Sequence, residues 1–537
     1  MKVGVKQLQC FLDAFLAQPE SASYRCVQEP YGAFLQAVSP TAADLHEQRA
    51  HPPQPGPLFT LALVGSWDAS AWNQTFSSLL TQTYRRFDII RDLHYLQGDY
   101  ILFLWPGDSL APDALYHFAK SANDGADLIY CDEDIRAQGH AGERCEPFFK
   151  SAPNRITQMS YDMLSCGVAV KQTLFHMAGG MEAPTPEGRF AYNLRCLCAS
   201  DKAVHIPYPL YTLSSDRRPG TKAGKFVQAP LRPKETASAG QWPGSLRVEW
   251  MQKRRPSTAI IIPTLDGMPA LRRLLESIEA QTLYPYSRIV IADMGSRDPQ
   301  TLRYYQILQK NRAANIVGGF NGSLSKLLNR AALEARAEVL LFLGQDTEIL
   351  APNWLECLLA QLYRPGVGAA GGKLVDSLGR IRFSGGVGGL DGWAASFYSG
   401  CQDSLSNLRQ NRFVNSIHTV SVLCLWCMAL RSSIFWETGG FDEELTQAGL
   451  DIELCLRLSK ENLSCVYTPY ALLRCHAPLP SLVNAPAWDQ RRCYDVLQEL
   501  LLHGDPHCSP NYDFSQPVPV AAAQPKPAME LNKFAPA

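Results

Sequence analysis

The chain has 537 residues, too many for one ordinary hydrophobic core, so we expect two domains with extensions. Its composition, 46% hydrophobic and 19% charged, is that of a soluble globular protein, and a formal net charge of -1 gives no electrostatic case for a nucleic-acid partner. No apolar run reaches the roughly 18 to 20 residues that cross a bilayer and the N-terminus lacks a signal-peptide apolar region, so we expect a cytoplasmic protein, with peripheral association at the inner face of a membrane left open.

Residues 1–56 are expected to form a helical extension. Leu8, Phe11 and Phe15 have the spacing of one short amphipathic helix, and Leu45 with its neighbours indicates another. The Pro-rich run at 51–57 then marks a boundary.

From residue 57 onward, strands and helices alternate. Apolar runs at 58–64, 99–105 and 126–130 predict strands, and the spacing of Trp72 and Phe76 predicts a helix after the first of them. This alternation is typical of βαβ units with a mostly parallel sheet, so the expected fold class is α/β.

The second half of the chain repeats the first. Four landmarks recur in the same order: an opening strand, a helix that ends in a Gln-Thr pair, a strand that delivers an acid before an Ala-Pro turn, and a Gly-Gly pair. They are 58–64, Gln82-Thr83, Asp108 and Gly179-Gly180 in the first half, and 259–263, Gln281-Thr282, Asp346 and Gly439-Gly440 in the second. We therefore predict two copies of one domain, a first copy at 57–235 and a second copy at 256–500. Residues 236–255 would be a linker, and 501–537 a disordered tail that is rich in Pro and Ala toward its end.

Three acids and one histidine of the second copy are candidates for chemistry, and each has a structural alternative. Asp293 and Asp346 end predicted strands, where open α/β sheets bind ligands, so they could contact a nucleotide and a divalent cation, or else cap helices. Asp451 opens an amphipathic helix whose N-terminal dipole keeps an acid ionised, as a general base requires, although an acid in a first turn is common. His476 follows the last predicted strand, where a lone His is more often structural than a ligand.

Two other patterns are weaker. Cys424 and Cys427 have metal-site spacing but lie in an apolar run without a second pair, which favours core packing over zinc. The glycine-rich run 385–389 neither matches a dinucleotide fingerprint nor opens a helix, so a flexible loop over an acceptor is the better interpretation. Trp393 would then either stack on a sugar or belong to the core.

Several segments of the second copy carry a family resemblance through their order along the chain. They are Ile261-Ile262-Pro263-Thr264, Ala280-Gln281-Thr282, Asp293-Met294-Gly295-Ser296-Arg297-Asp298, Phe320-Asn321 with Ser325-Lys326-Leu327-Leu328-Asn329, Leu341-Phe342-Leu343-Gly344-Gln345-Asp346-Thr347-Glu348, Gly439-Gly440-Phe441-Asp442-Glu443 and Asp451-Ile452-Glu453-Leu454-Cys455-Leu456-Arg457. In this order they resemble the family 2 glycosyltransferases of the GT-A fold, in particular tandem-domain bacterial members of surface-polysaccharide synthesis. The resemblance spans most of residues 57–500.

The resemblance implies two tandem GT-A-like, Rossmann-like domains and a role for each candidate. The nucleotide sugar would lie against Pro263, Thr264, Asp266, Asp293, Ser296, Lys326, Asn329 and Gln345. Asp346 and His476 would bind a divalent cation, Mg²⁺ or Mn²⁺, that neutralises the departing diphosphate. Asp451 would be the general base of a single, inverting displacement, with Glu453 and Trp393 on the acceptor side. The implied activity is transfer of a hexose or rhamnose from a nucleotide-diphosphate sugar to a glycan, lipid-linked or protein acceptor of the cell surface.

Some positions depart from the family pattern. Gly344-Gln345-Asp346 lacks one expected acid, Leu450 replaces a polar residue before the base, and Cys475 replaces a second His. These losses leave open an alternative, a non-catalytic glycan-binding or assembly protein made of two decayed transferase domains.

The first copy departs further. Ala191 is expected at its base position, and the segment between Ile90 and Gly98 is too short for the usual helix and nucleotide-binding strand. We therefore expect the first copy to act as a scaffold, or to bind an acceptor or partner, rather than to transfer sugar.

Overall fold

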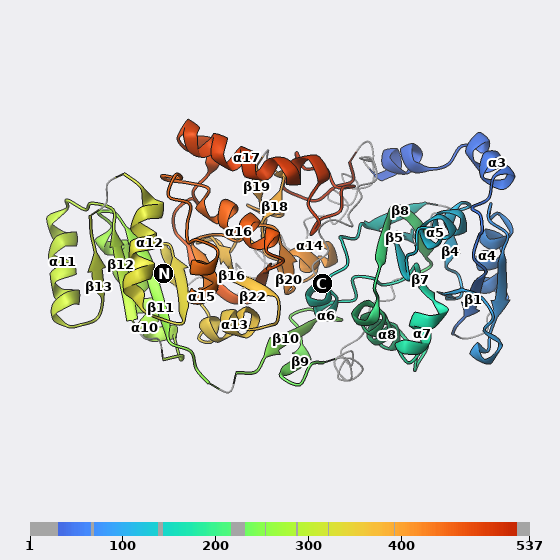
Figure 1. The fold of residues 1–537 in the computed structure, drawn as a ribbon, viewed down its shortest axis with the longest axis horizontal. Helices are drawn as coiled ribbons and strands as arrows, with labels where there is room; N and C mark the ends of the chain where they lie inside the picture. The colour runs from blue at the N-terminus through green and yellow to red at the C-terminus, as the bar shows by residue number, and fades with distance from the viewer. Residues whose placement is uncertain are drawn as a thin grey trace, which may run out of the picture.

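The computed structural model describes residues 31–65, 69–137, 143–215, 231–252, 254–285, 288–319, 322–390 and 393–522. The helix expected around Leu8 to Phe15, the Phe320-Asn321 motif and the end of the tail lie outside these residues. The two predicted copies form two lobes side by side along the long axis of the molecule (Figure 1). Among the described residues, no helix combines the length and apolar character that crossing a bilayer requires.

The N-terminal extension packs on the first copy. Its helix α3 (Ala42–Ala50) begins with a capping box, in which Thr41 Oγ1 accepts the N–H of Asp44 at 3.2 Å and the Asp44 carboxylate accepts the N–H of Thr41 at 2.8 Å. Before this helix, Tyr31 and Phe34 are buried against Phe149 of the first copy.

The first copy is a mixed sheet in the order β2-β1-β3-β7-β5-β8-β4, with β6 paired to β5. Its strands are β1 (Phe59–Leu63), β2 (Phe87–Ile90), β3 (Tyr100–Leu104), β4 (Ser109–Leu110), β5 (Leu128–Arg136), β6 (Arg144–Phe148), β7 (Val168–Lys171) and β8 (Ala203–Leu213). Its helices are α4 (Ala69–Leu80), α5 (Ala114–Asn123), α6 (Arg155–Ser160), α7 (Gln172–Met177) and α8 (Pro186–Ala199).

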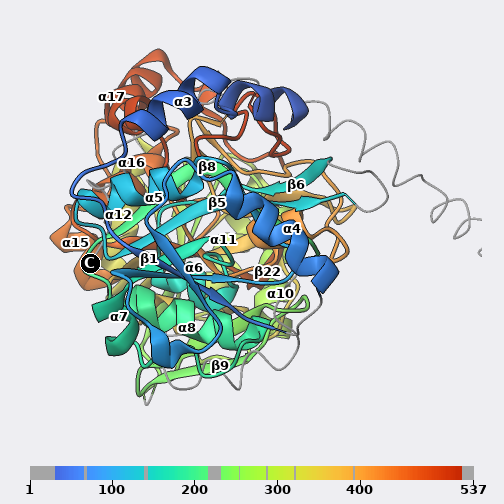
Figure 2. The same ribbon diagram turned by 90° about the vertical axis from the view of Figure 1, so that its right-hand side faces the viewer.

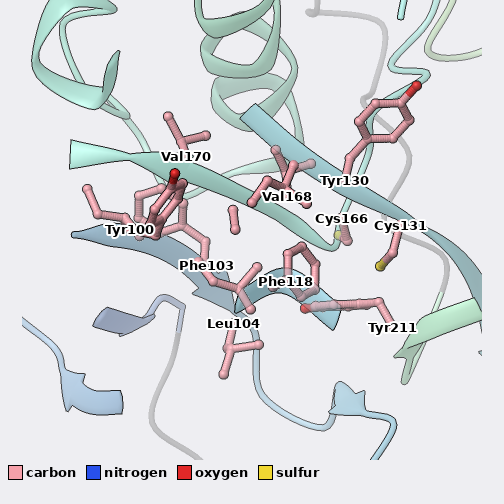
Figure 3. Close-up of a cluster of buried hydrophobic side chains, with 14 of the residues drawn as sticks. Tyr100, Phe103, Leu104, Phe118, Tyr130, Cys131, Cys166, Val168, Val170 and Tyr211 are labelled. Atoms are coloured by element: carbon pink, nitrogen blue, oxygen red, sulfur yellow. The ribbon is translucent and has the colours of Figure 1, made fainter. Parts of the chain in front are cut away.

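Aromatic side chains fill the core of the first copy. Figure 3 shows Tyr100 and Phe103 of β3 beside Val168 and Val170 of β7, with Phe118 among them. Because β1, β3 and β7 are buried along nearly their whole lengths, their sequences are continuous apolar runs rather than alternating ones.

The second copy has the same strand order with two additional strands, β13 and β20. Its sheet runs β13-β12-β11-β14-β21-β16-β22-β15, with β17 paired to β16 and β20 paired to β22. The strands are β11 (Thr258–Thr264), β12 (Arg288–Asp293), β13 (Asn315–Val317), β14 (Val339–Leu343), β15 (Thr347–Ile349), β16 (Val367–Val375), β17 (Ile381–Phe383), β20 (His418–Val420), β21 (Cys427–Arg431) and β22 (Ser464–Cys475), beside a small separate pair, β18 (Val387–Gly388) and β19 (Ala394–Ala395). The helices are α10 (Met268–Gln281), α11 (Pro299–Lys310), α12 (Leu324–Ala335), α13 (Trp354–Leu362), α14 (Leu408–Val414), α15 (Ser432–Glu437), α16 (Leu450–Lys460) and α17 (Ala487–His503).

The strand orders confirm the α/β class and agree with the internal repeat. Strands β12, β11, β14, β21, β16, β22 and β15 correspond to β2, β1, β3, β7, β5, β8 and β4, with the same parallel and antiparallel pairings. Strand β13 and helix α11 have no counterpart at residues 91–99, which are all described. The first copy therefore lacks the strand that lies outermost beside the candidate nucleotide residues of the second.

The segment predicted as a linker is instead an ordered hairpin. Strands β9 (Glu235–Ala239) and β10 (Leu246–Trp250) pair antiparallel and lie between the lobes (Figure 1). Buried Trp242 donates from Nε1 to Ser416 Oγ at 3.0 Å, and the carbonyl of Val248 accepts from Gln361 Nε2 at 2.8 Å, both in the second copy. The sequence suggested a linker because its polar residues fall on the exposed side of a two-stranded element.

The C-terminal segment also differs from its prediction as a disordered tail. Residues 505–522 pack across both copies: Asn511 Nδ2 donates to Asp132 Oδ2 of the first copy at 2.9 Å, and Asp505 Oδ2 accepts the N–H of Gly388 of the second at 2.7 Å. Tyr512 is buried against Phe149 and Phe397, one from each copy. Figure 2, which looks along the long axis from the first copy, shows α17 and α3 on the same side of the molecule.

Candidate active site

Two neighbouring strand ends build the candidate nucleotide side of the second copy. Strands β11 and β12 are parallel and in register, so Thr264 lies opposite Asp293 at the carboxyl edge of the sheet. Asp293 Oδ1 accepts the N–H of Ser296 at 3.0 Å and the hydroxyl of Tyr305 at 3.3 Å. The structure thus brings Thr264, Asp293 and Ser296 together as the resemblance implied.

The loop after β11 is strained and tied to the loop after β12. Asp266 has a left-handed backbone with φ of 44°, which costs a non-glycine residue of the order of 1 kcal/mol. Its Oδ1 compensates by accepting the N–H groups of Arg297 at 2.6 Å and Asp298 at 2.7 Å. A strained residue held this firmly fixes the shape of the loop before any ligand arrives.

Gln345, in the position of the missing acid, ties the third strand end to this loop. Its Oε1 accepts the N–H of Leu265 at 3.1 Å. A Cβ on Gly267 would approach Gln345 Nε2 to 2.7 Å, so a larger residue there would push the amide from its position. The turn Gly344-Gln345-Asp346 is therefore part of the same assembly, and Pro263 lies inside β11 beneath it.

Two residues expected at the nucleotide lie on α12. Lys326 is exposed in the first turn of the helix. Asn329 is buried and differs from the expectation: its Nδ2 donates to the carbonyl of Phe441, and its Oδ1 accepts the N–H of Phe441, both at 2.9 Å. Its amide thus holds the Gly439-Gly440-Phe441 loop, because a side-chain amide can accept from the backbone N–H of Phe441 and donate to its carbonyl at the same time.

Asp346 and His476 are neighbours across β15 and β22. The N–H of His476 donates to the carbonyl of Asp346 at 2.9 Å, and the His476 imidazole contacts Glu348 Oε2 at 2.9 Å through Nε2. Arg474 also donates to Glu348 Oε2, at 3.0 Å. Partial burial alone would raise the pKa of Glu348, but these partners lower it. Sequence reasoning missed Glu348 as the residue that orients His476, although the antiparallel pairing places the two at the same sheet edge.

These residues fit a cation that phosphates carry into the site. The Asp346 carboxylate has no hydrogen-bond partner among the described residues, and those residues contain no group of three side chains arranged as a metal centre. A Mg²⁺ or Mn²⁺ ion shared with a diphosphate needs only one or two protein carboxylates. Asp346 would hold such an ion, with His476 beside it.

Asp451 lies in the first turn of α16, after Gly449 in a left-handed conformation with φ of 79°. Its Oδ2 accepts the N–H of Leu425 at 3.1 Å, and its Oδ1 accepts the N–H of Ile452 at 3.0 Å. We expected the helix dipole to keep this acid readily ionised, but burial outweighs the backbone hydrogen bonds and raises the pKa of Asp451. A raised pKa makes the carboxylate a stronger base.

A cleft of about 350 Å³ opens at Asp451. Trp393, which the sequence placed either on the acceptor side or in the core, lines it together with Trp426 and Arg382. The N–H of Gly344 donates to the carbonyl of Trp426 at 3.3 Å, and a Cβ on Gly344 would meet the Trp426 ring at 2.8 Å, so this glycine lets the indole pack on the turn of Asp346. Asp451 therefore lines a cavity of the size that binds small ligands, and Trp426 connects the wall of this cavity to the turn of Asp346.

Glu453, expected on the acceptor side, lies outside this cleft. It is buried and forms a two-point ion pair with Arg457, whose Nη2 also donates to the carbonyl of Gly440 at 2.8 Å. The sequence alone could not distinguish Glu453 from Asp451, because both lie in the first turn of α16 and differ only in the direction in which the side chain leaves the helix. Glu453 stabilises the Gly439-Gly440 loop.

The same arginine contact locates the matching site in the first copy. Arg195 of α8 donates to the carbonyls of Ala178 and Gly180 at 2.7 and 2.6 Å, as Arg457 does to those of Thr438 and Gly440. Counting back equally from both arginines pairs Asp451 with Arg189, and Glu453 with Ala191. The assignment of Ala191 to the base position is therefore wrong, and a cation occupies that position.

Arg189 closes the first copy's site. It is buried, its Nε donates to Asp162 Oδ2 at 3.0 Å, and its Nη1 contacts Cys166 Sγ at 3.0 Å. The cavity beside it holds only about 40 Å³, room for a few waters, and Trp242 and Arg412 from outside the first copy line it. A sugar does not fit in this space.

Replacing Arg189 with Asp is expected to destabilise the protein without creating a second active site. The new carboxylate would face Asp162 in a buried cavity, at a cost of roughly 3 to 5 kcal/mol. Urea unfolding measures the loss, with Arg189→Lys as the control that keeps the charge. Sugar transfer by Arg189→Asp in an Asp451→Asn background would contradict the view that the first copy is closed.

Comparisons with known proteins match one family and two curated relatives. Residues 259–438 match the family described as "Glycosyl transferase family 2". The chain is 30% identical over 435 residues to "O-antigen biosynthesis protein RfbC" of Myxococcus xanthus, which covers 77% of this chain and 34% of that protein. It is 31% identical over 412 residues to "Uncharacterized protein y4gI" of Sinorhizobium fredii, which covers 71% of this chain and 44% of that protein. The chain thus spans less than half the length of these curated relatives.

Solved structures with similar folds include two nucleotide complexes. One is GalNAc-T7 with UDP, GalNAc and Mn²⁺, at 15% identity and a TM-score of 0.38, covering 48% of this chain and 52% of that one. The other is the mannosyltransferase PcManGT from Pyrobaculum calidifontis with GDP-Man and Mn²⁺, at 15% identity and a TM-score of 0.32, covering 46% of this chain and 70% of that one.

Proposed function

Because residues 259–438 match glycosyl transferase family 2, we propose that the second copy is an inverting glycosyltransferase. It would move a sugar from a nucleotide-diphosphate donor to a glycan or another cell-surface acceptor. The observation that carries the proposal is Asp451, a half-buried acid with a raised pKa at a 350 Å³ cleft, whose wall at Trp426 packs on the Asp346 turn. The relative named for O-antigen biosynthesis supports a polysaccharide acceptor.

The mechanism follows from the positions of the side chains. The acceptor would enter the cleft between Trp393 and Asp451, and its hydroxyl proton would pass to the Asp451 carboxylate as the oxygen attacks the anomeric carbon. The backbone N–H of Leu425 fixes one carboxylate oxygen, which leaves the group oriented before the acceptor binds. A divalent cation, when bound at Asp346, would neutralise charge on the diphosphate. One base and one leaving group on opposite sides of the sugar give inversion.

We propose a scaffolding role for the first copy. Three consecutive acids of β5 are engaged internally: Asp132 contacts His205 at 2.7 Å, Glu133 binds Lys150 at 3.1 Å, and Asp134 is hydrogen-bonded to Tyr31. With Arg189 at its base position, the first copy supports the second copy through the hairpin and the C-terminal segment.

Release of nucleoside diphosphate tests the transferase proposal. A panel of UDP-, GDP- and dTDP-sugars is offered with and without Mg²⁺ or Mn²⁺, and we expect one donor to yield free nucleoside diphosphate at a rate above that of Asp451→Asn. If no donor is consumed above that background and none binds in calorimetry, the alternative of a non-catalytic assembly protein replaces this proposal.

A further inference from the structure

One face of the second sheet gathers positive charge where a diphosphate would lie. Phe383, Leu374, Leu473 and Ile349 form one row across β17, β16, β22 and β15, and all four pack in the same core cluster. Because side chains alternate along a strand, the residues next to this row point to the opposite face. These are Arg382, Arg474 and Glu348, and Glu348 also holds His476 on that side.

Arg382 is the least engaged cation of this group. Arg474 and His476 both contact Glu348, at 3.0 and 2.9 Å. In the described part of the chain, Arg382 reaches only Asp376, at 3.7 Å, and that carboxylate already accepts from Arg380 at 2.9 Å and from two backbone N–H groups. Among the described residues, the buried Nε of Arg382 has no hydrogen-bond partner. Its guanidinium is therefore available to a ligand.

The cleft places this guanidinium at the reacting end of the site. Arg382 and Asp451 are the charged residues that line it among the described residues. Trp426 lines the same cleft, and its ring packs on Gly344 in the turn of Asp346. Arg382 thus lines a cleft whose wall also contacts the turn that would hold the cation.

We propose that Arg382 binds the diphosphate of the nucleotide donor and takes over charge neutralisation that the missing acid at Gln345 would otherwise provide through a metal ion. This rests on the proposed transferase function. In the transfer step the acceptor oxygen forms a bond to the anomeric carbon and gives its proton to Asp451. The bond from that carbon to the phosphate oxygen breaks, and its electron pair stays on the diphosphate. A guanidinium, with its fixed fork of N–H donors, suits this oxygen pair.

Nucleotide binding without metal tests the proposal directly. Calorimetry with UDP, GDP, dTDP and their monophosphates, all in EDTA, compares the wild type with Arg382→Gln and Arg382→Lys. Arg380→Gln is the matched control, because Arg380 lies on the same hairpin and binds Asp376 but does not line the cleft. We expect Arg382→Gln to weaken binding of the preferred diphosphate by about tenfold or more, with Arg382→Lys between it and the wild type. The affinity for the monophosphate should not change, which also shows that the variant is folded.

Each outcome decides something. Equal diphosphate affinity in wild type and Arg382→Gln overturns the role of Arg382 while leaving the transferase proposal intact, and would fit an arginine that contacts an acidic acceptor instead. An equal loss in Arg380→Gln would likewise overturn it, by showing that the hairpin rather than this guanidinium matters. A wild-type protein that binds none of the nucleotides, with or without metal, overturns the transferase proposal itself.

Discussion

Replacing Asp451 with Asn is expected to lower the rate of sugar transfer by roughly 100- to 10,000-fold while donor binding stays unchanged. Asparagine has the same shape, and its carbonyl oxygen can still accept the N–H of Leu425. It cannot take a proton from the acceptor, so the loss falls on kcat. Steady-state rates for the donor found above, with calorimetry of the nucleotide, separate the two effects.

The direction of the shift in the pKa of Asp451 predicts how the transfer rate and the stability depend on pH. Because burial raises the folded pKa of Asp451, the wild-type rate should increase as pH rises through that pKa, and the acid limb should lie above the usual range for Asp. The same group lowers stability as pH rises between its unfolded and folded pKa values, because the folded state binds the proton more tightly there. Asp451→Asn should therefore melt at or above the wild-type temperature at neutral pH.

Glu453→Gln is the matched control on the same helix. This change weakens the pair with Arg457 and should lower the melting temperature, yet the remaining folded protein should transfer sugar at nearly the wild-type rate. If Glu453→Gln abolished transfer and Asp451→Asn did not, the two acids would have to exchange roles.

Replacing Asp489 with Ala is expected to destabilise the protein by roughly 3 kcal/mol and to slow transfer by about tenfold or more. The Asp489 carboxylate is fully buried at the start of α17 and accepts the N–H groups of Thr446, Gln447 and Ala448 at 2.9, 2.8 and 3.1 Å. These residues lead directly into the helix of Asp451, and Gln447 and Ala448 line the cleft. Without the carboxylate the three donors lose their partner, and the base loses its fixed position.

Asp495→Ala on the exposed side of the same helix is the control for Asp489→Ala. Urea unfolding gives the change in stability, and kcat measured well below the unfolding midpoint gives the positional effect. Full activity in a folded Asp489→Ala protein would show that the loop keeps its shape without this acid.

The sequence predicted those features that depend on local pattern. Continuous apolar runs predicted the buried strands. The acids that follow or end these strands, Asp293 and Asp346, lie at the carboxyl edge of the sheet. The sequence could not predict how α8 aligns with α16. Only the contact of Arg195 with the Gly179-Gly180 loop identifies Arg189 as the counterpart of Asp451. Asn329 was misjudged for a similar reason, since a polar residue near a site satisfies a backbone loop as readily as a ligand.

The hairpin and the C-terminal segment show the limit of composition as a guide. Polar and Pro-rich stretches were taken as linker and tail, but three of their apolar residues, Trp242, Val248 and Tyr512, are buried. Isolated buried residues of this kind show no hydrophobic periodicity in the sequence. They pack on surfaces that exist only after both copies have folded.

The hydrogen bond between Asn511 and Asp132 can form only late in the synthesis of the chain. The two residues are 379 positions apart, so at about 5 to 20 residues per second the ribosome needs roughly 20 to 80 seconds between them. During that interval the surface of the first copy that later packs on the C-terminal segment is uncovered, and Phe149 lacks its contact with the ring of Tyr512. A nascent chain stalled near residue 500 would expose this aromatic surface to chaperones, so a segment that is made late completes the packing of the first copy.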